Sequence, residues 1–436
     1  MKPADIKKII RNWPAYRKFV ENKGIDPKTV NDLSELPVVD KQFIASAIHM
    51  IPLFRVRNII PSSGSTGDDF SFGLFGDTDL KKASYTVDAI LKNRFHSAYK
   101  KTLLINMLPG AISLQSSTAS VASIGVRADT AVSVIKSLGS CFDQLILVGE
   151  PLFMKKVIEL GVKESILWKH IPLYIIIGGE WTSLGYGNYL EGIAGPQRVF
   201  SFMGMAELGL CYFYETDATI SLRKIVSGDR LLRQTLFGEA DFCPMLFEYD
   251  ENEICVESLS DPPGPFDSLI LTTADPKRAL PLIRYRGGDK GKILSKDEIN
   301  RALEAMGYAR IFDPCGSQIL AHFGRGKGIS NVYPEKVKEI IFSREEIAST
   351  TTGNFRLCRE EDTLYLKVQL KEDIYPAFSL RKMYEQAFAG LPVQVTPYLF
   401  EEFPHLLDFE RKIRYVCEDN NGEGRSREKI GVPLAV

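Results

Sequence analysis

Continuous apolar runs alternate with amphipathic helical patterns over the first 210 residues of the chain. The clearest runs of strand length are "KTLLINML" (101–108), "QLILVGE" (144–150) and "LYIIIGGE" (173–180). Helical patterns accompany them at 77–95, 130–140 and 151–163. Strands that are buried on both faces read as uninterrupted apolar runs, so this alternation predicts a parallel α/β sheet. Ligands of such sheets bind beyond the carboxyl ends of the strands, where two of these runs end in glycine and glutamate.

The pattern changes after about residue 210. Shorter runs separated by Pro, Gly and Asp predict a mixed or antiparallel β subdomain: "NEICVES" (252–258), "DSLILTT" (267–273) and "LPLIRYR" (280–286). The sequence after "HFGRGKG" predicts a compact α+β unit, with helices at 333–343 and 379–390, a hairpin at 354–370 and a strand at 392–400.

We therefore predict an α/β protein of two domains. The large N-terminal domain, residues 1–323, contains parallel sheets and the β subdomain. The small α+β C-terminal domain, residues 324–436, is expected to be mobile. Glycines around Arg325 and Lys327 provide a natural hinge between them, because glycine adopts backbone angles that other residues avoid.

Composition narrows the class of protein. The 436 residues are 44% hydrophobic and 25% charged, as in a soluble globular protein with more than one domain. The net charge of -1 argues against a dominant nucleic-acid or anionic-membrane surface. Seven scattered cysteines without a CxxC pair predict reduced thiols rather than a zinc site. With no signal-peptide pattern and no run of membrane-spanning length, we expect a cytoplasmic protein.

A small-residue loop is the first candidate for chemistry. In "PSSGSTGDDF" (61–70), Gly64 and Gly67 permit backbone N–H groups to converge on an anion, and four hydroxyl side chains add donors. The loop is not a Walker motif, because GxxxxGK[ST] is absent. The same residues also fit a solvated turn, so this stretch alone is compatible with either an anion-binding loop or a turn.

Three charged positions are further candidates. Asp289 ends "LIRYRGGD", where a carboxylate could accept two hydrogen bonds from a vicinal diol such as ribose, or simply belong to a salt-bridged edge strand. Glu207 follows the apolar "FSFMGMA" and could hold a hard cation such as Mg²⁺, or begin a surface helix. Lys412 lies between Arg411 and Arg414, in a basic cluster of the kind that is usually solvated.

Taken in order, these stretches resemble the ANL superfamily of adenylate-forming enzymes and, within it, the phenylacetate–CoA ligase-like branch. The match covers about residues 30–416. Its most specific part is "LTTADPKRALPLIRYRGGD" (271–289), which is similar to the branch's TTLTKEALPVIRYRTGD. The other matching stretches are "LPVVDKQFI" (36–44), "SSGSTG" (62–67), "GGEWTS" (178–183), "MGMAE" (203–207), "FGRGKGISNVYPEKVKEII" (323–341) and "FERKIRYV" (409–416).

The resemblance implies an activity and a set of site residues. Members of this superfamily use ATP to convert a carboxylic acid to an acyl-adenylate, so the implied ligands are ATP, Mg²⁺, a small carboxylic acid and, in many members, CoA. Glu207 would bind the metal, and Lys412 would neutralise charge between the carboxylate and the α-phosphate. The residues that would bind ATP are Ser62, Ser63, Gly64, Ser65, Thr66, Gly67, Gly179, Glu180, Met203, Gly204, Asp289 and Arg325.

The remaining implied roles concern the hinge and the acid. Lys327 lies near the family's hinge position, about which the small domain turns in many members. Met107 and Phe202 would shape the acid pocket, and their apolar character favours a hydrophobic, aryl acid over a charged amino acid.

The chain also departs from the family pattern. Asp68 and Asp69 stand where the phosphate loop usually has lysine, Met203 replaces an aromatic residue, and Ala206 replaces a hydroxyl. About five residues are missing after Arg325, including a glycine of the pantetheine path, so adenylation is better supported than thioester formation. The acyl acceptor stays open among CoA, an amine, a carrier protein and a reductase.

Two alternatives follow from these departures. One is a non-catalytic binding protein on a ligase scaffold. The other is an acyl-transferring synthetase that feeds a reductase or a carrier protein, for which Cys417 is the only acceptor cysteine near the C-terminus.

Overall fold

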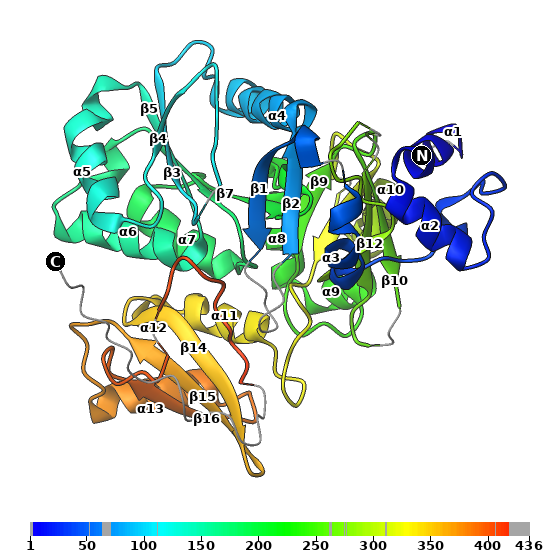
Figure 1. Ribbon diagram of the computed structural model, residues 1–436. Coiled ribbons are helices and arrows are strands. Elements are labelled where there is room, and N and C mark those ends of the chain that lie inside the picture. The colour runs from blue at the N-terminus through cyan, green and yellow to red at the C-terminus, as the bar shows by residue number, and fades with distance from the viewer. Residues whose placement is uncertain are drawn as a thin grey trace, which may run out of the picture.

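The computed structural model has two parts, a large one built on an eleven-stranded sheet and a small one built on a three-stranded sheet (Figure 1). It describes residues 3–51, 53–62, 71–110, 112–260, 264–273, 275, 277–309, 312–405 and 407–417. No helix in this described part of the chain is long and apolar enough to cross a membrane. The predicted combination of a large sheet domain and a small α+β domain is confirmed.

One half of the large sheet is parallel, as the apolar runs predict. Its strands, in spatial order, are β4 (Ser120–Ser123), β3 (Thr102–Met107), β5 (Gln144–Gly149), β6 (Leu173–Ile177) and β7 (Val199–Met205). The helices that pack on this half are α4 (Asp77–Phe95), α5 (Ala128–Leu138), α6 (Pro151–Lys163) and α7 (Leu184–Ala194). Because the strands are parallel, the carboxyl ends of β3, β5 and β6 lie at one edge, where the chain continues into Gly110, Glu150 and Gly179.

The other half of the sheet is antiparallel, which confirms the predicted β subdomain. It contains β8 (Gly209–Tyr214), β9 (Met245–Tyr249), β13 (Gln318–His322), β12 (Tyr285–Ser295), β11 (Ser268–Thr273) and β10 (Ile254–Leu259). The helices of this half are α8 (Asp217–Gly228), α9 (Arg230–Phe237) and α10 (Lys296–Ala305). The N-terminal helices α1 (Pro3–Asn12), α2 (Pro14–Asn22) and α3 (Lys41–Ala47) share its apolar cluster.

The strands β1 (Val56–Ser62) and β2 (Ser71–Gly76) pair antiparallel in a separate two-stranded sheet. Short 3-10 helices lie at Leu33–Glu35, Ile48–Met50, Leu53–Arg55, Gly139–Cys141 and Trp168–His170.

The position predicted for the strand at 280–286 is wrong. The strand begins only at Tyr285 and runs on to Ser295, so Asp289 lies inside β12 rather than in a turn after it. Arg284 has a left-handed φ of 44° and its guanidinium pairs with Glu257 at 2.9 Å, which breaks the extended run before β12. Val39 of the "LPVVD" segment fills the place of a neighbouring strand, because its N–H donates to the Arg284 carbonyl at 3.0 Å.

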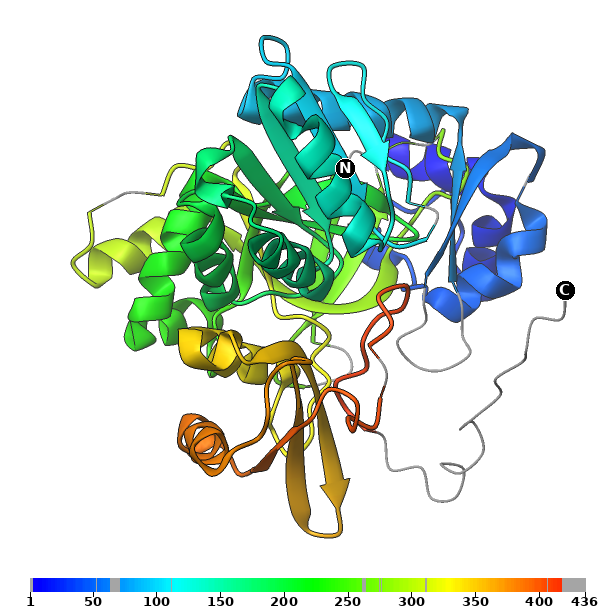
Figure 2. The same cartoon turned by 90° about the vertical axis from the view of Figure 1, so that its left-hand side faces the viewer.

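The small part, here called the lid, contains the predicted helix, hairpin, helix and strand. Its elements are α11 (Pro334–Ser343), α12 (Glu345–Ala348), β14 (Thr351–Glu360), β15 (Thr363–Leu370), α13 (Phe378–Phe388) and β16 (Gln394–Tyr398). β14 and β15 are antiparallel, and β16 is parallel to β15. The lid lies below α6 and α7 in Figure 1, and its last segment, drawn in red, rises toward the large part in Figures 1 and 2.

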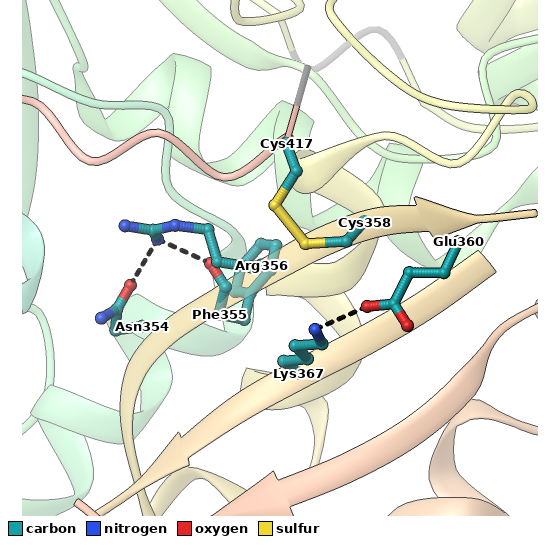
Figure 3. Close-up of a disulfide and its surroundings, with 7 residues drawn as sticks. All are labelled: Asn354, Phe355, Arg356, Cys358, Glu360, Lys367 and Cys417. Carbon is teal, nitrogen blue, oxygen red and sulfur yellow. Dashed lines mark hydrogen bonds and ion pairs between the residues drawn. A yellow bond between two sulfur atoms is a disulfide. The ribbon is translucent and has the colours of Figure 1, made fainter. Parts of the chain in front are cut away.

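The expectation that all cysteines are reduced thiols is wrong for one pair. Cys417 is joined to Cys358 of β14 by a disulfide (Figure 3). Main-chain hydrogen bonds bring the two together, because Leu357 N–H donates to Tyr415 O at 2.7 Å and Cys417 N–H donates to Leu357 O at 2.8 Å. The spacing of 59 residues gave no sequence signal for this pairing.

Candidate active site

Asp289 is held in a bulge of β12. Three residues of β11, from Ser268 to Ile270, face five residues of β12, from Arg286 to Lys290, so the Gly-Gly-Asp stretch between them leaves the regular ladder. Glycine is favoured there, since Gly288 has a φ of 93° and Gly287 packs against the end of the Met205 side chain. The bulge turns the Asp289 carboxylate toward Arg325, whose Nε lies 3.0 Å from Asp289 Oδ1.

The environment of Asp289 favours a permanently charged carboxylate. Burial would raise its pKa, but the Arg325 guanidinium and then His322 hold the pKa below its usual value. Arg325 is itself fixed by a second hydrogen bond, from Nη1 to the Gly287 carbonyl at 3.0 Å. His322 Nε2 lies 3.7 Å from Asp289 Oδ1, and within the described part of the chain neither ring nitrogen of this buried histidine has a hydrogen-bond partner.

Glu207 lies in the tight turn between β7 and β8, not at the start of a helix. It is 2% exposed, and Lys41 Nζ, at the start of α3, approaches Glu207 Oε1 at 3.8 Å. Arg278 fixes the turn by donating to the Leu208 carbonyl at 2.8 Å. The Glu207 charge is also felt by Tyr285, whose pKa is raised first by burial and then by this carboxylate.

The described flank of the small-residue loop lies at the same turn. A Cβ on Gly73 of β2 would be 1.8 Å from the Ala206 carbonyl oxygen, so only glycine lets β2 pack this closely against the residue before Glu207. Of the predicted phosphate-binding residues, Ser62 ends β1, and residues 63–67 lie outside the described residues. The hairpin therefore brings the base of the loop to Glu207.

Lys412 reaches the large part from the lid. Burial is the main cause that lowers its pKa, followed by the positive charge of Arg325, whereas Asp289, Glu150 and Glu180 act in the opposite direction. The Lys412 side chain is half-buried, and the charges that act on it belong to the large part and the hinge, so it does not lie on the fully solvated face that the basic sequence suggests. Two residues earlier, Glu410 Oε2 accepts a hydrogen bond from Gly110 N–H at 2.9 Å, which fixes the segment beyond β3.

Two glutamates at the carboxyl ends of β5 and β6 complete the surroundings of Lys412. Glu180 Oε2 accepts hydrogen bonds from Lys338 Nζ and from the Tyr415 hydroxyl, each at 2.8 Å and each from the lid. Glu150 packs on Gly179, where a Cβ would lie 2.8 Å from its Oε1. Burial raises the pKa of Glu150 to about 8, and the Glu180 charge acts in the same direction against the opposing lysines.

The structure brings most of the predicted site residues together, but not all. Five of the predicted residues surround one region between the two parts: Glu207, Asp289, Arg325, Glu180 and Lys412. Met203 and Gly204 belong to the same β7–β8 hairpin as Glu207, and Gly179 lies beside Glu180.

The two residues expected to shape the acid pocket lie apart. Met107 is fully buried in the apolar cluster shared with the lid, whereas Phe202 packs on a different cluster, together with α4. Lys327 is exposed beside the hinge glycines. The roles proposed for these three residues stay predictions.

Several residues of the site were missed by the sequence reasoning. Glu150, Lys338 and Tyr415 face Lys412 or its partners, and Lys41 faces Glu207. A signal existed for Glu150, because it ends an apolar run just as Glu180 does. Lys338 and Tyr415 belong to no recognisable motif in their helix and C-terminal segment. Only their contacts with Glu180 in the folded structure identify them.

These residues fit ATP and a single magnesium ion. A buried aspartate held by an arginine suits a ribose diol, because the carboxylate oxygens can accept hydrogen bonds from both hydroxyl groups. No group of three or more His, Cys, Asp or Glu side chains that could hold a metal occurs in the described part of the chain. One carboxylate, from Glu207, is nevertheless sufficient for Mg²⁺, which is commonly bound by one or two carboxylates together with substrate phosphates and water.

The comparisons with known proteins give the class of fold. No family model and no curated protein matches the sequence. Among solved structures, 2-hydroxyisobutyryl-CoA ligase in the postadenylation state, in complex with R3-HIB-AMP, matches with a TM-score of 0.67 at 15% identity, over 96% of this chain and 89% of that chain. The same ligase in the thioesterification state, in complex with 2-HIB-AMP and CoA, matches with a TM-score of 0.54 at 15% identity, over 95% and 88%.

A benzoate CoA ligase from Burkholderia xenovorans LB400 matches with a TM-score of 0.50 at 11% identity, over 82% of this chain and 68% of that chain. The chain thus has the fold of these CoA ligases, as the ordered motifs predict. The structures it is similar to are acyl-CoA and aryl-CoA ligases.

Proposed function

We propose that this protein uses ATP to activate a carboxylic acid as an acyl-adenylate. The observation that carries the proposal is the segment of Lys412, which is fixed to the large part on both sides: Glu410 accepts from Gly110 N–H at 2.9 Å, and the Tyr415 hydroxyl donates to Glu180 at 2.8 Å. A lysine in this position can neutralise charge between two anions that repel each other, and such preorganised stabilisation is a large part of catalysis. A likeness in fold to ligases with acyl-AMP ligands supports the same reading.

The proposed reaction is an in-line displacement at the α-phosphate. A carboxylate oxygen forms the bond to phosphorus, the bond to the bridging oxygen of the β-phosphate breaks, and pyrophosphate leaves with the electron pair. No proton moves in this step, so the protein's contribution is to position the reactants and neutralise charge. Lys412 would do this at the attacking and α-phosphate oxygens.

The other residues of the region would bind the nucleotide. Asp289 would accept hydrogen bonds from the ribose hydroxyls, while Arg325 keeps it charged and oriented. Main-chain groups at Gly179 and Glu180 would line the adenine, and residues 62–67 would hold the departing pyrophosphate. Glu207 would bind Mg²⁺, which supplies charge neutralisation for phosphate oxygens when bound.

We further propose that the acid is hydrophobic, with an aryl acid favoured. Phe202 of β7, to which the resemblance assigns a role in the acid pocket, packs on a buried apolar cluster that includes Leu108, Ile176 and Phe200. Pockets for small molecules are mostly apolar with a few polar groups that fix orientation. An aryl acid would meet both conditions, because its flat ring would pack on the apolar lining and its carboxylate would contact the polar groups.

An acid-dependent pyrophosphate assay tests the proposal. Purified protein is incubated with ATP, Mg²⁺ and a panel of aryl, branched and straight-chain acids, and hydroxylamine traps any acyl-adenylate as a hydroxamate. We expect pyrophosphate and hydroxamate to appear together with at least one hydrophobic acid. If no acid of the panel causes pyrophosphate release, adenylation is refuted.

A second candidate is a nucleotide-binding protein without turnover. One observation favours it: Lys41 lies 3.8 Å from the Glu207 carboxylate that should hold the metal. Calorimetry with ATP and Mg²⁺ on the same preparation separates the two. Binding together with acid-dependent pyrophosphate supports the enzyme, and binding without it supports the second candidate.

A further inference from the structure

The last described segment of the lid, residues 409–417, carries Lys412 and is here called the C-terminal segment. Before Lys412, the Phe409 ring packs edge to face against Phe153 of α6 with centroids 5.1 Å apart, and Glu410 accepts a main-chain hydrogen bond from the large part. The contacts on the other side of Lys412 therefore decide whether the lysine is held at both ends.

After Lys412, the C-terminal segment lies parallel to β14. Leu357 N–H donates to the Tyr415 carbonyl at 2.7 Å, and Cys417 N–H donates to the Leu357 carbonyl at 2.8 Å, which places Val416 opposite Leu357. β14 is at the edge of the three-stranded sheet, so the segment extends that sheet by a very short pairing. Strand pairing of this length is weak by itself, and chain segments with few hydrogen bonds open at little cost in free energy.

The disulfide reinforces this short pairing. Cys417 is bonded to Cys358, the residue after Leu357, and the two Cα atoms are 4.9 Å apart (Figure 3). The sequence separation is 59 residues, and a cross-link over a loop of this size restricts the open chain strongly, which favours the paired state. Both cysteines belong to the lid, so the bond does not restrain the motion of the lid relative to the large part.

Tyr415 connects this pairing to the candidate site. Its hydroxyl donates to Glu180 Oε2 at 2.8 Å, and its ring packs on Phe355 of β14 with centroids 4.5 Å apart. Tyr415 is three residues after Lys412 and two residues before Cys417. The pairing that the disulfide reinforces is thus the pairing that directs Tyr415 to Glu180 and holds the chain on the far side of Lys412.

The two bonded cysteines differ from each other in accessibility. Cys358 is 8% exposed, whereas Cys417 is half-buried, so Cys417 Sγ is the sulfur that a reagent reaches first. Thiol–disulfide exchange begins with the attack of a thiolate on an accessible sulfur. The other five cysteines have free thiols: Cys141, Cys211, Cys243, Cys255 and Cys315.

We propose that Cys358 and Cys417 form a redox-modification site, at which thiol–disulfide exchange controls how firmly the C-terminal segment is held on β14. In the oxidised protein the segment stays paired, and Lys412 is held at both ends. In the reduced protein the short pairing opens more often, so a smaller fraction of the molecules presents Lys412 to the site. The effect on the rate of adenylation rests on the proposed function, whereas the exchange reaction and the opening of the segment do not.

The exchange needs a thiol reductant such as glutathione or a protein dithiol. A thiolate of the reductant attacks Cys417 Sγ, a bond between these two sulfurs forms, and Cys358 leaves as a thiolate that takes a proton from water. A second thiol of the reductant attacks the mixed disulfide and displaces Cys417, which also takes a proton. The protein gains two electrons and two protons, and the two thiols of the reductant lose them and become a disulfide.

Mass spectrometry tests the exchange reaction directly. The full chain is equilibrated with mixtures of reduced and oxidised glutathione, quenched with acid, alkylated in denaturant and digested without reductant. We expect one transition between the peptide that links Cys358 to Cys417 and the two alkylated peptides. Cys141, which is exposed and has a free thiol, serves as the internal control for alkylation. Two alkylated cysteines in every mixture, including oxidised glutathione alone, would overturn the inference.

Hydrogen exchange tests the opening of the C-terminal segment without relying on turnover. Peptides that cover residues 409–417 are compared between protein oxidised with glutathione and protein reduced with dithiothreitol. We expect the amide of Cys417, which donates to β14, to exchange roughly 10-fold faster or more in the reduced protein, because the weaker pairing opens more often. Peptides of α6 should exchange equally in both. Equal exchange of the C-terminal segment in the two forms would overturn the proposal.

A matched pair of variants, Cys417→Ser and Cys141→Ser, links the bond to the rate. We expect reduction of the wild type to lower acid-dependent pyrophosphate release roughly 3- to 10-fold, because the rate follows the fraction of molecules in the competent state. Cys417→Ser should equal the reduced wild type in exchange and rate, and dithiothreitol should not change either further. Cys141→Ser should respond to dithiothreitol as the wild type does.

The outcomes separate the redox site from the proposed function. A Cys417→Ser protein that matches the oxidised wild type in both hydrogen exchange and rate would overturn the redox inference. If the linked peptide and the exchange response are both present but no form of the protein releases pyrophosphate, the redox site is supported and the proposed function fails.

Discussion

The two sides of the candidate site are built in different ways. On the antiparallel side, Asp289, Arg325 and His322 are brought together by the bulge of β12 and its neighbours, so this part is preformed. On the parallel side, Glu150 and Glu180 end two strands, and their partners Lys338, Tyr415 and Lys412 all come from the lid.

This difference separates binding from turnover. On the proposed function, the antiparallel side would bind the nucleotide without needing the lid, because its charges are already paired and buried. The parallel side acquires its positive charge only when the lid is docked. Variants on the two sides should therefore fail in different ways, one in affinity and the other in rate, and this contrast can be tested directly.

The largest effect is expected for Lys412→Ala. Removing a charge that acts in the transition state should lower turnover roughly 10²-fold or more, with only a small change in ATP affinity. Steady-state pyrophosphate release gives kcat, and calorimetry gives the affinity. Arg411→Ala is the matched control, since this neighbour is 81% exposed and pairs only loosely with Asp408. A rate for Lys412→Ala within a few-fold of the control would remove Lys412 from the mechanism.

Asp289→Asn tests the preformed side. This change keeps the shape but removes a charged acceptor, and hydrogen bonds to charged groups contribute about 1.5–3 kcal/mol, so ATP should bind roughly 10- to 10²-fold more weakly. Glu257→Gln is the control, because it also breaks a carboxylate–arginine pair in the antiparallel half but faces Arg284 near the N-terminal segment. Calorimetry with ATP should show normal affinity in the control. Equal losses in both variants would indicate damage to the sheet rather than loss of a ribose contact.

The sequence predicted this site unevenly, and the reason is physical. Helix 77–95 and the apolar strands follow from local periodicity and end where expected. Glu207, Asp289 and Lys412 were found through the order of the motifs, because each belongs to a stretch with a recognisable pattern. Lys41, Lys338 and Tyr415 act across long separations, and no local pattern marks a side chain that meets its partner only in the folded chain.

The position of β12 illustrates the same limit. Arg284, Tyr285 and Arg286 alternate as a strand would, but the left-handed Arg284 and the Glu257 pair delay the strand by five residues. Periodicity predicted that a strand exists there. The bulge that orients Asp289 contacts Met205 and Arg325. Both residues are far from Asp289 in the chain, so a local stretch of sequence does not indicate these contacts.

The smallest effect is expected for Glu150→Gln, measured as a pH dependence of stability. The groups that face Glu150 are Glu180, Lys412, Lys338 and Glu410, and its pKa is raised from 4.5 to about 8, chiefly by burial. Between these two pH values the folded protein keeps a proton that the unfolded chain releases, so this group makes the folded state less stable as pH rises. Below the lower value and above the upper one, the contribution is constant.

Glutamine cannot ionise, so the variant should lack this slope. We expect the Tm of the wild type to fall relative to that of Glu150→Gln as pH rises from about 5 to 8, by an amount on the order of 1–2 °C for a chain of this size. Glu410→Gln is a useful control, because this carboxylate also acts on Glu150 but its side chain is exposed. A Tm difference that does not change with pH would show that Glu150 is already ionised in the folded protein. The parallel side would then carry one more negative charge for Lys412 to balance before ATP binds.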